Sequence, residues 1–176
     1  MRCRMRRILS LLIASFAVAA SAVYADVDVI DRIMAVVDGQ TITLSDVTAA
    51  LQFREVEPPA GTADPVGYTL NRLIERTLML TEVDRFQPPE PDPTEISTRV
   101  DDLQKRAGSE AAFDKALSMT GTTREQLRRS IRDDLRITTY LNQRFGSASK
   151  ERDAAIATWI GELRRRAEVA LLYAPK

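Results

Sequence analysis

The side chains that could carry out chemistry are limited to carboxylates, hydroxyls, lysines and arginines, because none of the 176 residues is a histidine. The only cysteine, Cys3, lies in the first few residues. Without histidine, the sequence excludes Ser-His and Cys-His nucleophile pairs, histidine-ligated zinc and the most common general base. Carboxylate pairs, Ser-Lys arrangements and calcium on oxygen ligands remain, but no EF-hand spacing, glycine-rich phosphate loop or nucleophile elbow is present.

Two pairs of adjacent acids are the strongest candidates for carboxylate chemistry. Asp101-Asp102 and Asp133-Asp134 both fall in segments that we expect to be helical. Adjacent residues on a helix do not face each other, so the two carboxylates of each pair should diverge. We interpret both pairs as solvated helix faces. The sequence therefore predicts no catalytic residue, no metal site, no cofactor and no enzymatic activity.

Residues 1–25 have the three parts of a secretory signal peptide. Four arginines precede an apolar stretch from Ile8 to Ala20, which is short for a membrane span. Val23-Tyr24-Ala25 has the small-x-small pattern of a cleavage site, and Ala20-Ser21-Ala22 is an alternative site of the same pattern. We therefore predict export and cleavage after Ala25, which leaves one domain at residues 26–176. An uncleaved membrane anchor is the alternative.

The charge of the exported part argues against two classes of partner. The chain has 25 basic residues, of which four precede residue 26, and 25 acidic residues, none of which does. Residues 26–176 therefore carry 21 basic and 25 acidic side chains, a net charge of −4. This balance argues against nucleic acid or an anionic membrane as the main partner. The same residues have no cysteine, so they are not a disulfide scaffold.

A hairpin centred on Asp38-Gly39 is the clearest structural signal. Asp-Gly between apolar runs favours a two-residue turn, because a type I′ turn needs positive φ at both central residues. The turn sets three cross-strand pairs: Val37 with Gln40, Ala35 with Ile42, and Ile33 with Leu44. Their apolar side chains share one face that must be covered. A lone hairpin is marginally stable, so we expect the run Val169–Tyr173 to join it as a third strand.

Six helices are expected between the hairpin and the last strand. Thr43 is an expected N-cap, Asp92-Pro93 is a further strong helix start, and Thr122-Thr123-Arg124-Glu125 opens the longest helix. Apolar periodicity and Pro or Gly breaks place the helices at about 44–57, 66–86, 93–107, 110–119, 122–145 and 150–167. The expected fold class is mostly α, with a small antiparallel sheet formed by the N-terminal hairpin and the C-terminal strand.

Three blocks of this sequence, in order, resemble the SurA family of periplasmic chaperones. The first, Ile33–Asp46, looks like that family's opening hairpin and helix start. The second, Phe113–Phe145, is similar to its short helix ending at a glycine and followed by a long arginine-rich helix. The third, from Trp159 to Val169, looks like its C-terminal helix and strand. Together the blocks extend over nearly all of the chain after residue 25.

The chain departs from the family pattern in one respect. Parvulin-type prolyl isomerase modules commonly lie between the long helix and the C-terminal helix, where this chain has only Gly146-Ser147-Ala148-Ser149. The resemblance therefore implies a chaperone core without isomerase activity. Its expected role is that of a periplasmic, ATP-independent holdase for unfolded outer-membrane or envelope protein precursors. A monomer and a homodimer in which the two copies exchange helices are both compatible with the sequence. The alternative is an envelope assembly adaptor with one fixed partner, and a carboxylate-based enzyme is a weaker third hypothesis.

Five apolar residues lie off the main stripes of their helices and are the candidates for client binding: Met79, Val83, Phe86, Ile137 and Tyr140. Flexible methionine and aromatic side chains suit promiscuous binding, so the two helices could line one groove. The alternative is that both helices are buried on two sides, which would make the same residues core. Trp159 shares a stripe with Ile156 and Leu163, so we expect it in the core.

Overall fold

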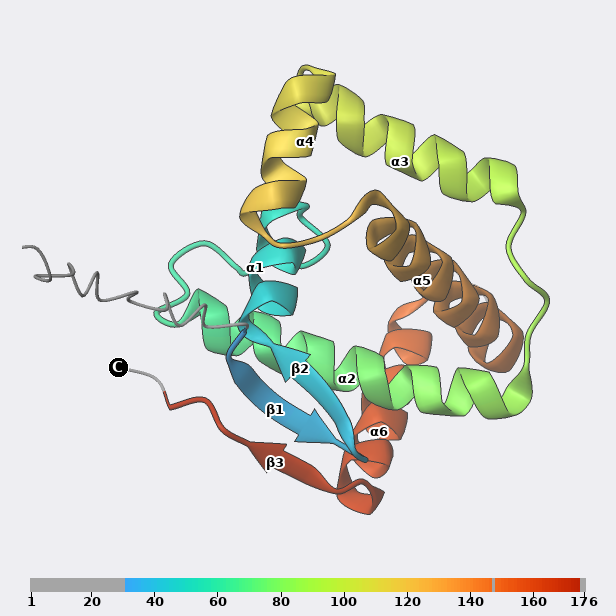
Figure 1. Ribbon diagram of the computed structural model, residues 1–176. Coiled ribbons are helices and arrows are strands. Elements are labelled where there is room, and N and C mark those ends of the chain that lie inside the picture. Colours follow the sequence, from blue (N-terminus) through green and yellow to red (C-terminus); the bar gives the residue numbers. More distant parts are fainter. Residues whose placement is uncertain (1–30, 147, 175–176) are drawn as a thin grey trace, which may run out of the picture. The chain divides into compact units, whose positions relative to one another are not determined.

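A computed structural model describes residues 31–146 and 148–174. Along the chain the elements are β1 (Ile33–Val37), β2 (Gln40–Thr43), α1 (Leu44–Gln52), α2 (Pro65–Phe86), α3 (Pro93–Ala107), α4 (Glu110–Met119), α5 (Arg124–Phe145), α6 (Lys150–Arg166) and β3 (Val169–Leu171). Six helices and a small antiparallel sheet confirm the expected fold class (Figure 1). The predicted signal peptide lies outside the described residues. Among the helices that are described, none is long and apolar enough to cross a membrane.

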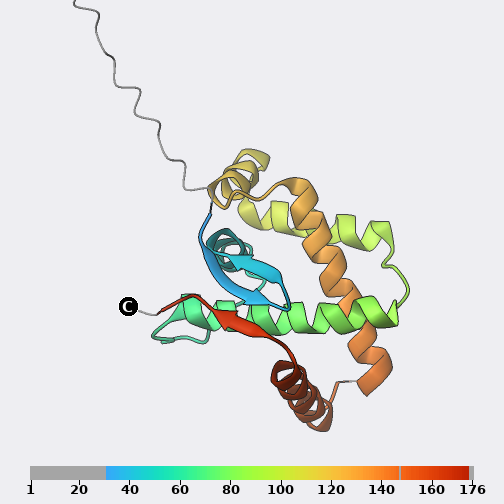
Figure 2. The ribbon, with the colours of Figure 1, turned by 60° about the horizontal axis from the view of Figure 1, so that its bottom comes forward.

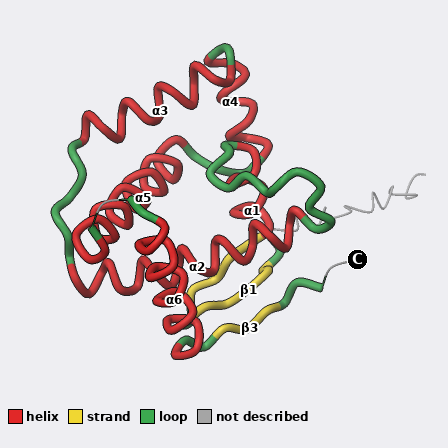
Figure 3. Tube along the Cα trace, turned by 180° about the vertical axis from the view of Figure 1, so that it is seen from behind, coloured by secondary structure: helices red, strands yellow, loops and turns green. Residues whose placement is uncertain are grey.

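The two ends of the described chain meet in one sheet. β1 is the central strand, and β2 and β3 pair with it on either side, both antiparallel (Figure 3). Asp38 and Gly39 have φ angles of +47° and +82°, as a type I′ turn requires. The turn is also tied to β3, because Asp38 N donates to Glu168 O at 2.9 Å and Glu168 N donates to Asp38 Oδ1 at 2.8 Å. The expected pairing of the hairpin with a C-terminal strand is confirmed.

One of the three expected hairpin pairs is wrong. A register shift between Ile33 and Ala35 places Ile33 opposite Thr43 instead of Leu44. The physical reason is that Thr43 caps α1, so the chain turns out of the sheet before Leu44 could pair. Ile33 and Leu44 are consequently exposed, and Met34 takes the buried place beside Ala35.

The first helix is shorter than the sequence suggests. α1 ends at Gln52, and Arg54 follows in the left-handed region with a φ of +54°, so the expected stop at Pro58 is wrong. Phe53 explains the early end, because its side chain is buried edge-to-face against Phe113, with ring centroids 6.1 Å apart. Burial of this aromatic ring outweighs the small gain from another helical turn. The other five helices follow their expected ranges to within two residues.

The buried side chains form two clusters that share α5. The first cluster lies between the sheet, α2, α6 and the C-terminal half of α5, and includes Val37, Ile42, Leu70, Ile74, Val83, Ile137, Tyr140, Trp159 and Leu163. The second lies between α3, α4 and the N-terminal half of α5, and consists of Phe53, Ile96, Val100, Phe113, Leu117, Leu127, Ile131 and Leu135. Figure 2 shows α5 running from the α3–α4 pair to α2. The expected core position of Trp159 is confirmed.

Candidate functional site

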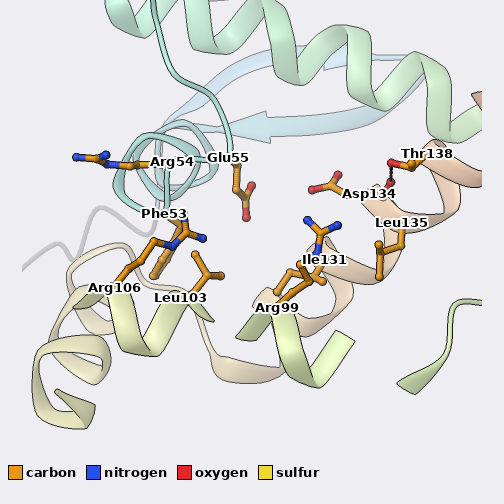
Figure 4. A pocket seen from close by; sticks show the side chains of 10 residues that line it. All are labelled: Phe53, Arg54, Glu55, Arg99, Leu103, Arg106, Ile131, Asp134, Leu135 and Thr138. Atoms are coloured by element: carbon orange, nitrogen blue, oxygen red, sulfur yellow. Dashed lines mark hydrogen bonds between the residues drawn. The ribbon is translucent and has the colours of Figure 1, made fainter. Parts of the chain in front are cut away.

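Three hollows follow one another between the loop after α1 and helices α2, α3, α4 and α5. The α4 hollow, of about 310 Å³, is lined by Gln52, Phe53, Arg54, Leu103, Arg106, Ala107, Phe113 and Ala116. The central hollow, of about 320 Å³, is lined by Phe53, Arg54, Glu55, Arg99, Leu103, Arg106, Ile131, Asp134, Leu135 and Thr138 (Figure 4). The α2 hollow, of about 360 Å³, is lined by Glu55, Val56, Glu57, Tyr68, Arg72, Leu73, Arg76, Met79, Asp134, Ile137 and Thr138. Because neighbouring hollows share lining residues, we describe them together as one groove.

The loop after α1 supplies the residues that join the hollows. The left-handed conformation of Arg54 reverses the chain direction, so Phe53 enters the second core and Glu55 reaches the groove. Two backbone hydrogen bonds hold this turn: Arg54 N donates to Leu51 O at 3.3 Å, and Glu55 N donates to Ala50 O at 2.9 Å. The wall formed by this loop is therefore fixed to the end of α1.

The floor of the central hollow is apolar. Ile131 and Leu135 come from α5 and stand four residues apart, so they lie on the same face of that helix. Phe53 and Leu103 face them from the α1 loop and from α3. Phe53, Ile131 and Leu135 are buried, and Leu103 is half-buried. The groove thus presents one side of the second core to its interior.

Carboxylates and arginines stand above this floor. In Figure 4, Glu55 and Asp134 point into the central hollow from opposite walls, and Arg99 extends from α3 toward Asp134 in this view. Arg76 Nε donates to Asp134 Oδ1 at 2.6 Å, and Arg76 Nη2 donates to Ser130 O at 2.9 Å, which ties α2 to α5 at the border of the α2 hollow. Desolvation raises the pKa of Glu55, the Asp134 carboxylate raises it further, and Arg76 opposes the shift.

The α4 hollow differs from the central hollow in its charge. The described residues that line it include two arginines, Arg54 and Arg106, and no carboxylate. Arg106 has no carboxylate partner anywhere in residues 31–146 and 148–174, and Arg54 lies 3.7 Å from Glu57 with both side chains strongly exposed. Arg99, Leu103 and Arg106 are spaced i, i+4 and i+7, so α3 presents all three to the groove.

The five candidate residues from the sequence are divided between the groove and the first core. Met79 and Ile137, from α2 and α5, meet on the wall of the α2 hollow. Ile137 also belongs to the first core, together with Val83 and Tyr140, so the expectation that one groove would hold all five is wrong. Phe86 is 60% exposed and packs edge-to-face on Tyr140, with ring centroids 5.2 Å apart, outside the three hollows. Burial on two sides of the helix therefore describes Val83, Ile137 and Tyr140.

Sequence reasoning missed the residues that build the centre of the groove. Ile131 and Leu135 belong to a stripe that has the spacing of an ordinary core face, and Phe53 was expected inside a helix. The sequence does show that Arg99 and Arg106 lie at one edge of the apolar stripe of α3, next to Leu103. This spacing places charged groups beside apolar surface.

The adjacent acids Asp133 and Asp134 have different arginine partners. Asp134 pairs with Arg76, whereas Asp133 lies 3.7 Å from Arg136. Within the described part of the chain, no group of three His, Cys, Asp or Glu side chains is placed to hold a metal ion. The groove lining combines apolar surface with charged groups of both signs. No model of a known protein family matches this chain, and no curated protein matches it either.

Proposed function

We propose that this protein is an ATP-independent holdase that acts in the periplasm and binds unfolded segments of envelope proteins, outer-membrane protein precursors above all, in the groove. The observation that carries the proposal is the apolar floor formed by Phe53, Leu103, Ile131 and Leu135 beneath charged walls. The resemblance of three sequence blocks to the SurA family points in the same direction. Unfolded polypeptide clients are therefore the expected partners.

The groove suits an extended segment because it consists of three adjoining hollows of mixed chemistry. Strands of β-barrel membrane proteins alternate apolar and polar residues. In an extended segment the apolar side chains would pack against the floor of the groove. The polar side chains would face the arginines and carboxylates of its walls. Few of the lining groups impose a particular sequence, so many segments with this alternation would be accepted. Such binding needs no chemical energy, because release follows when the client folds elsewhere.

An aggregation assay tests the proposal. An unfolded β-barrel membrane protein is diluted from urea with near-stoichiometric amounts of the mature protein, and light scattering is followed. We expect the wild type to suppress scattering for several unrelated clients. Leu103→Ser should lose much of this effect, because it removes a half-buried apolar contact from two of the three hollows.

Two matched variants locate the effect. Met119→Ser replaces an apolar residue that is 69% exposed and lies outside the groove, so its holdase activity should equal that of the wild type. Phe86→Ser tests the other exposed candidate and should also leave the activity intact. Equal activity of Leu103→Ser and the wild type would contradict the groove. If the wild type suppresses aggregation of no client and instead captures one fixed partner, the adaptor hypothesis replaces the holdase.

A further inference from the structure

We infer that the α4 hollow selects client segments in which an acidic residue stands next to an apolar one. This preference rests on the proposed function, because it concerns the same groove. The hollow combines a floor for an apolar side chain with a rim for a carboxylate. Its floor consists of Phe53, Phe113 and the small residues Ala107 and Ala116, and the rim carries Arg106 and Arg54.

The rim arginines are available to a ligand. Arg106 is exposed and has no carboxylate partner within the described residues, and the contact of Arg54 with Glu57 is long and solvated. A third arginine near this hollow, Arg124, is already occupied. Its Nη2 donates to Asp114 Oδ1 at 2.6 Å, and its guanidinium lies over the Phe113 ring at 5.1 Å. A client carboxylate would therefore meet Arg106 and Arg54.

The charges of the central hollow determine where along the groove the acidic client residue binds. Glu55 and Asp134 line the central hollow together with arginines, so an acidic client residue placed there would meet two carboxylates as well as positive charge. The α4 hollow has none among its lining residues, all of which the structure describes. A segment with one acidic residue is therefore held with that residue at the α4 end. Because this hollow continues into the central one, the rest of the segment can lie along the groove.

The experiment compares three fluorescently labelled peptides of alternating phenylalanine and serine that differ at one central position. This position holds aspartate, asparagine or lysine, and fluorescence anisotropy measures each dissociation constant with the mature protein. We expect the aspartate peptide to bind roughly twofold to fivefold more tightly than the asparagine peptide for each arginine engaged, as is typical of solvent-accessible ion pairs. The preference should shrink at high salt, because screening weakens exposed pairs.

Variants assign the preference to the hollow. The double variant Arg54→Gln/Arg106→Gln should bind the aspartate and asparagine peptides equally, and Arg106→Glu should shift the preference toward the lysine peptide. The matched control is Arg129→Gln, an exposed arginine of α5 that lines none of the three hollows, and it should keep the wild-type preference. Circular dichroism of each variant confirms that these surface changes leave the fold intact.

The possible outcomes separate this inference from the proposed function. Equal binding of all three peptides by the wild type overturns the acidic preference and leaves the groove as a general binding site. A preference that persists in the double variant overturns its assignment to the α4 hollow. Binding of none of the peptides overturns the proposed function together with the inference.

Discussion

Tyr140 and Phe86 touch each other but differ in burial, so the same substitution should have very different effects at the two positions. Tyr140 is 3% exposed and packs on Trp159 at 5.7 Å between ring centroids, and its hydroxyl accepts a hydrogen bond from Arg144 Nη1 at 2.9 Å. Phe86 covers the outer side of Tyr140 and is 60% exposed. The comparison also separates the two hypotheses for these residues, a client surface and a core.

The magnitudes follow from this difference. Replacing a buried aromatic residue by a small one lowers the free energy of unfolding by about 3–5 kcal/mol, because the removed contacts leave a cavity. We expect Tyr140→Ser to fall in this range and to lower the melting temperature on the order of 10 °C. Full burial of a large apolar side chain stabilises a protein by about 1.5–3 kcal/mol, so Phe86→Ser should destabilise by about 1 kcal/mol or less.

The assay uses a probe that the protein already contains. Trp159 is the only tryptophan and contacts Tyr140, so its fluorescence follows the first core during urea unfolding. Linear extrapolation then gives the free energy of unfolding of each variant, with Met119→Ser as the control for a surface change. If Tyr140→Ser unfolds at the same urea concentration as Phe86→Ser, the core position of Tyr140 is refuted and a client surface at this residue becomes tenable again.

Three further predictions follow from other parts of the molecule. A protein that ends at Ala167 should melt well below the full mature chain, because β1 loses one of its two partner strands; equal melting curves would contradict the pairing. For Glu55, the pKa in the folded protein is raised above its ordinary value of 4.5, so its contribution to stability is present below that pH and is lost as the pH rises through the folded pKa. Glu55→Gln should therefore gain stability relative to the wild type between about pH 4 and pH 7, and urea unfolding at both pH values that shows no relative gain would refute this. Intact mass of the exported protein should place its first residue at Asp26, and material that retains residues 1–25 would disprove cleavage.

Local signals in the sequence predicted most of the fold because the structure uses them directly. Asp38-Gly39 forms the turn that its chemistry favours, and Thr43 and Asp92 cap the helices that follow them. The errors arose where a distant contact decided the outcome. Phe53 leaves α1 to pack on Phe113, a residue sixty positions later in the chain, which no local pattern reveals.

The groove could be predicted only in part for the same reason. Its walls come from the α1 loop, α2, α3 and α5, and the spacing between these elements depends on tertiary packing. A stripe such as Ile131 and Leu135 looks the same in sequence whether it is fully covered or borders an open groove. Met79 and Ile137, which line the α2 hollow, lie off the main stripes of their helices, a feature that is visible in the sequence.

The central position of β1 has a consequence for the order in which the protein folds. Asp38 and Glu168, which join the hairpin turn to β3, are 130 residues apart, so the sheet closes only after almost the whole chain has been made. Helices α3, α4 and α5 are consecutive and supply nearly all of the second core, so they can associate earlier during synthesis. Until β3 arrives, β1, whose five residues are all apolar, presents an unpaired backbone edge to the solvent. During that interval the nascent protein carries an unpaired apolar strand and is itself at risk of aggregation.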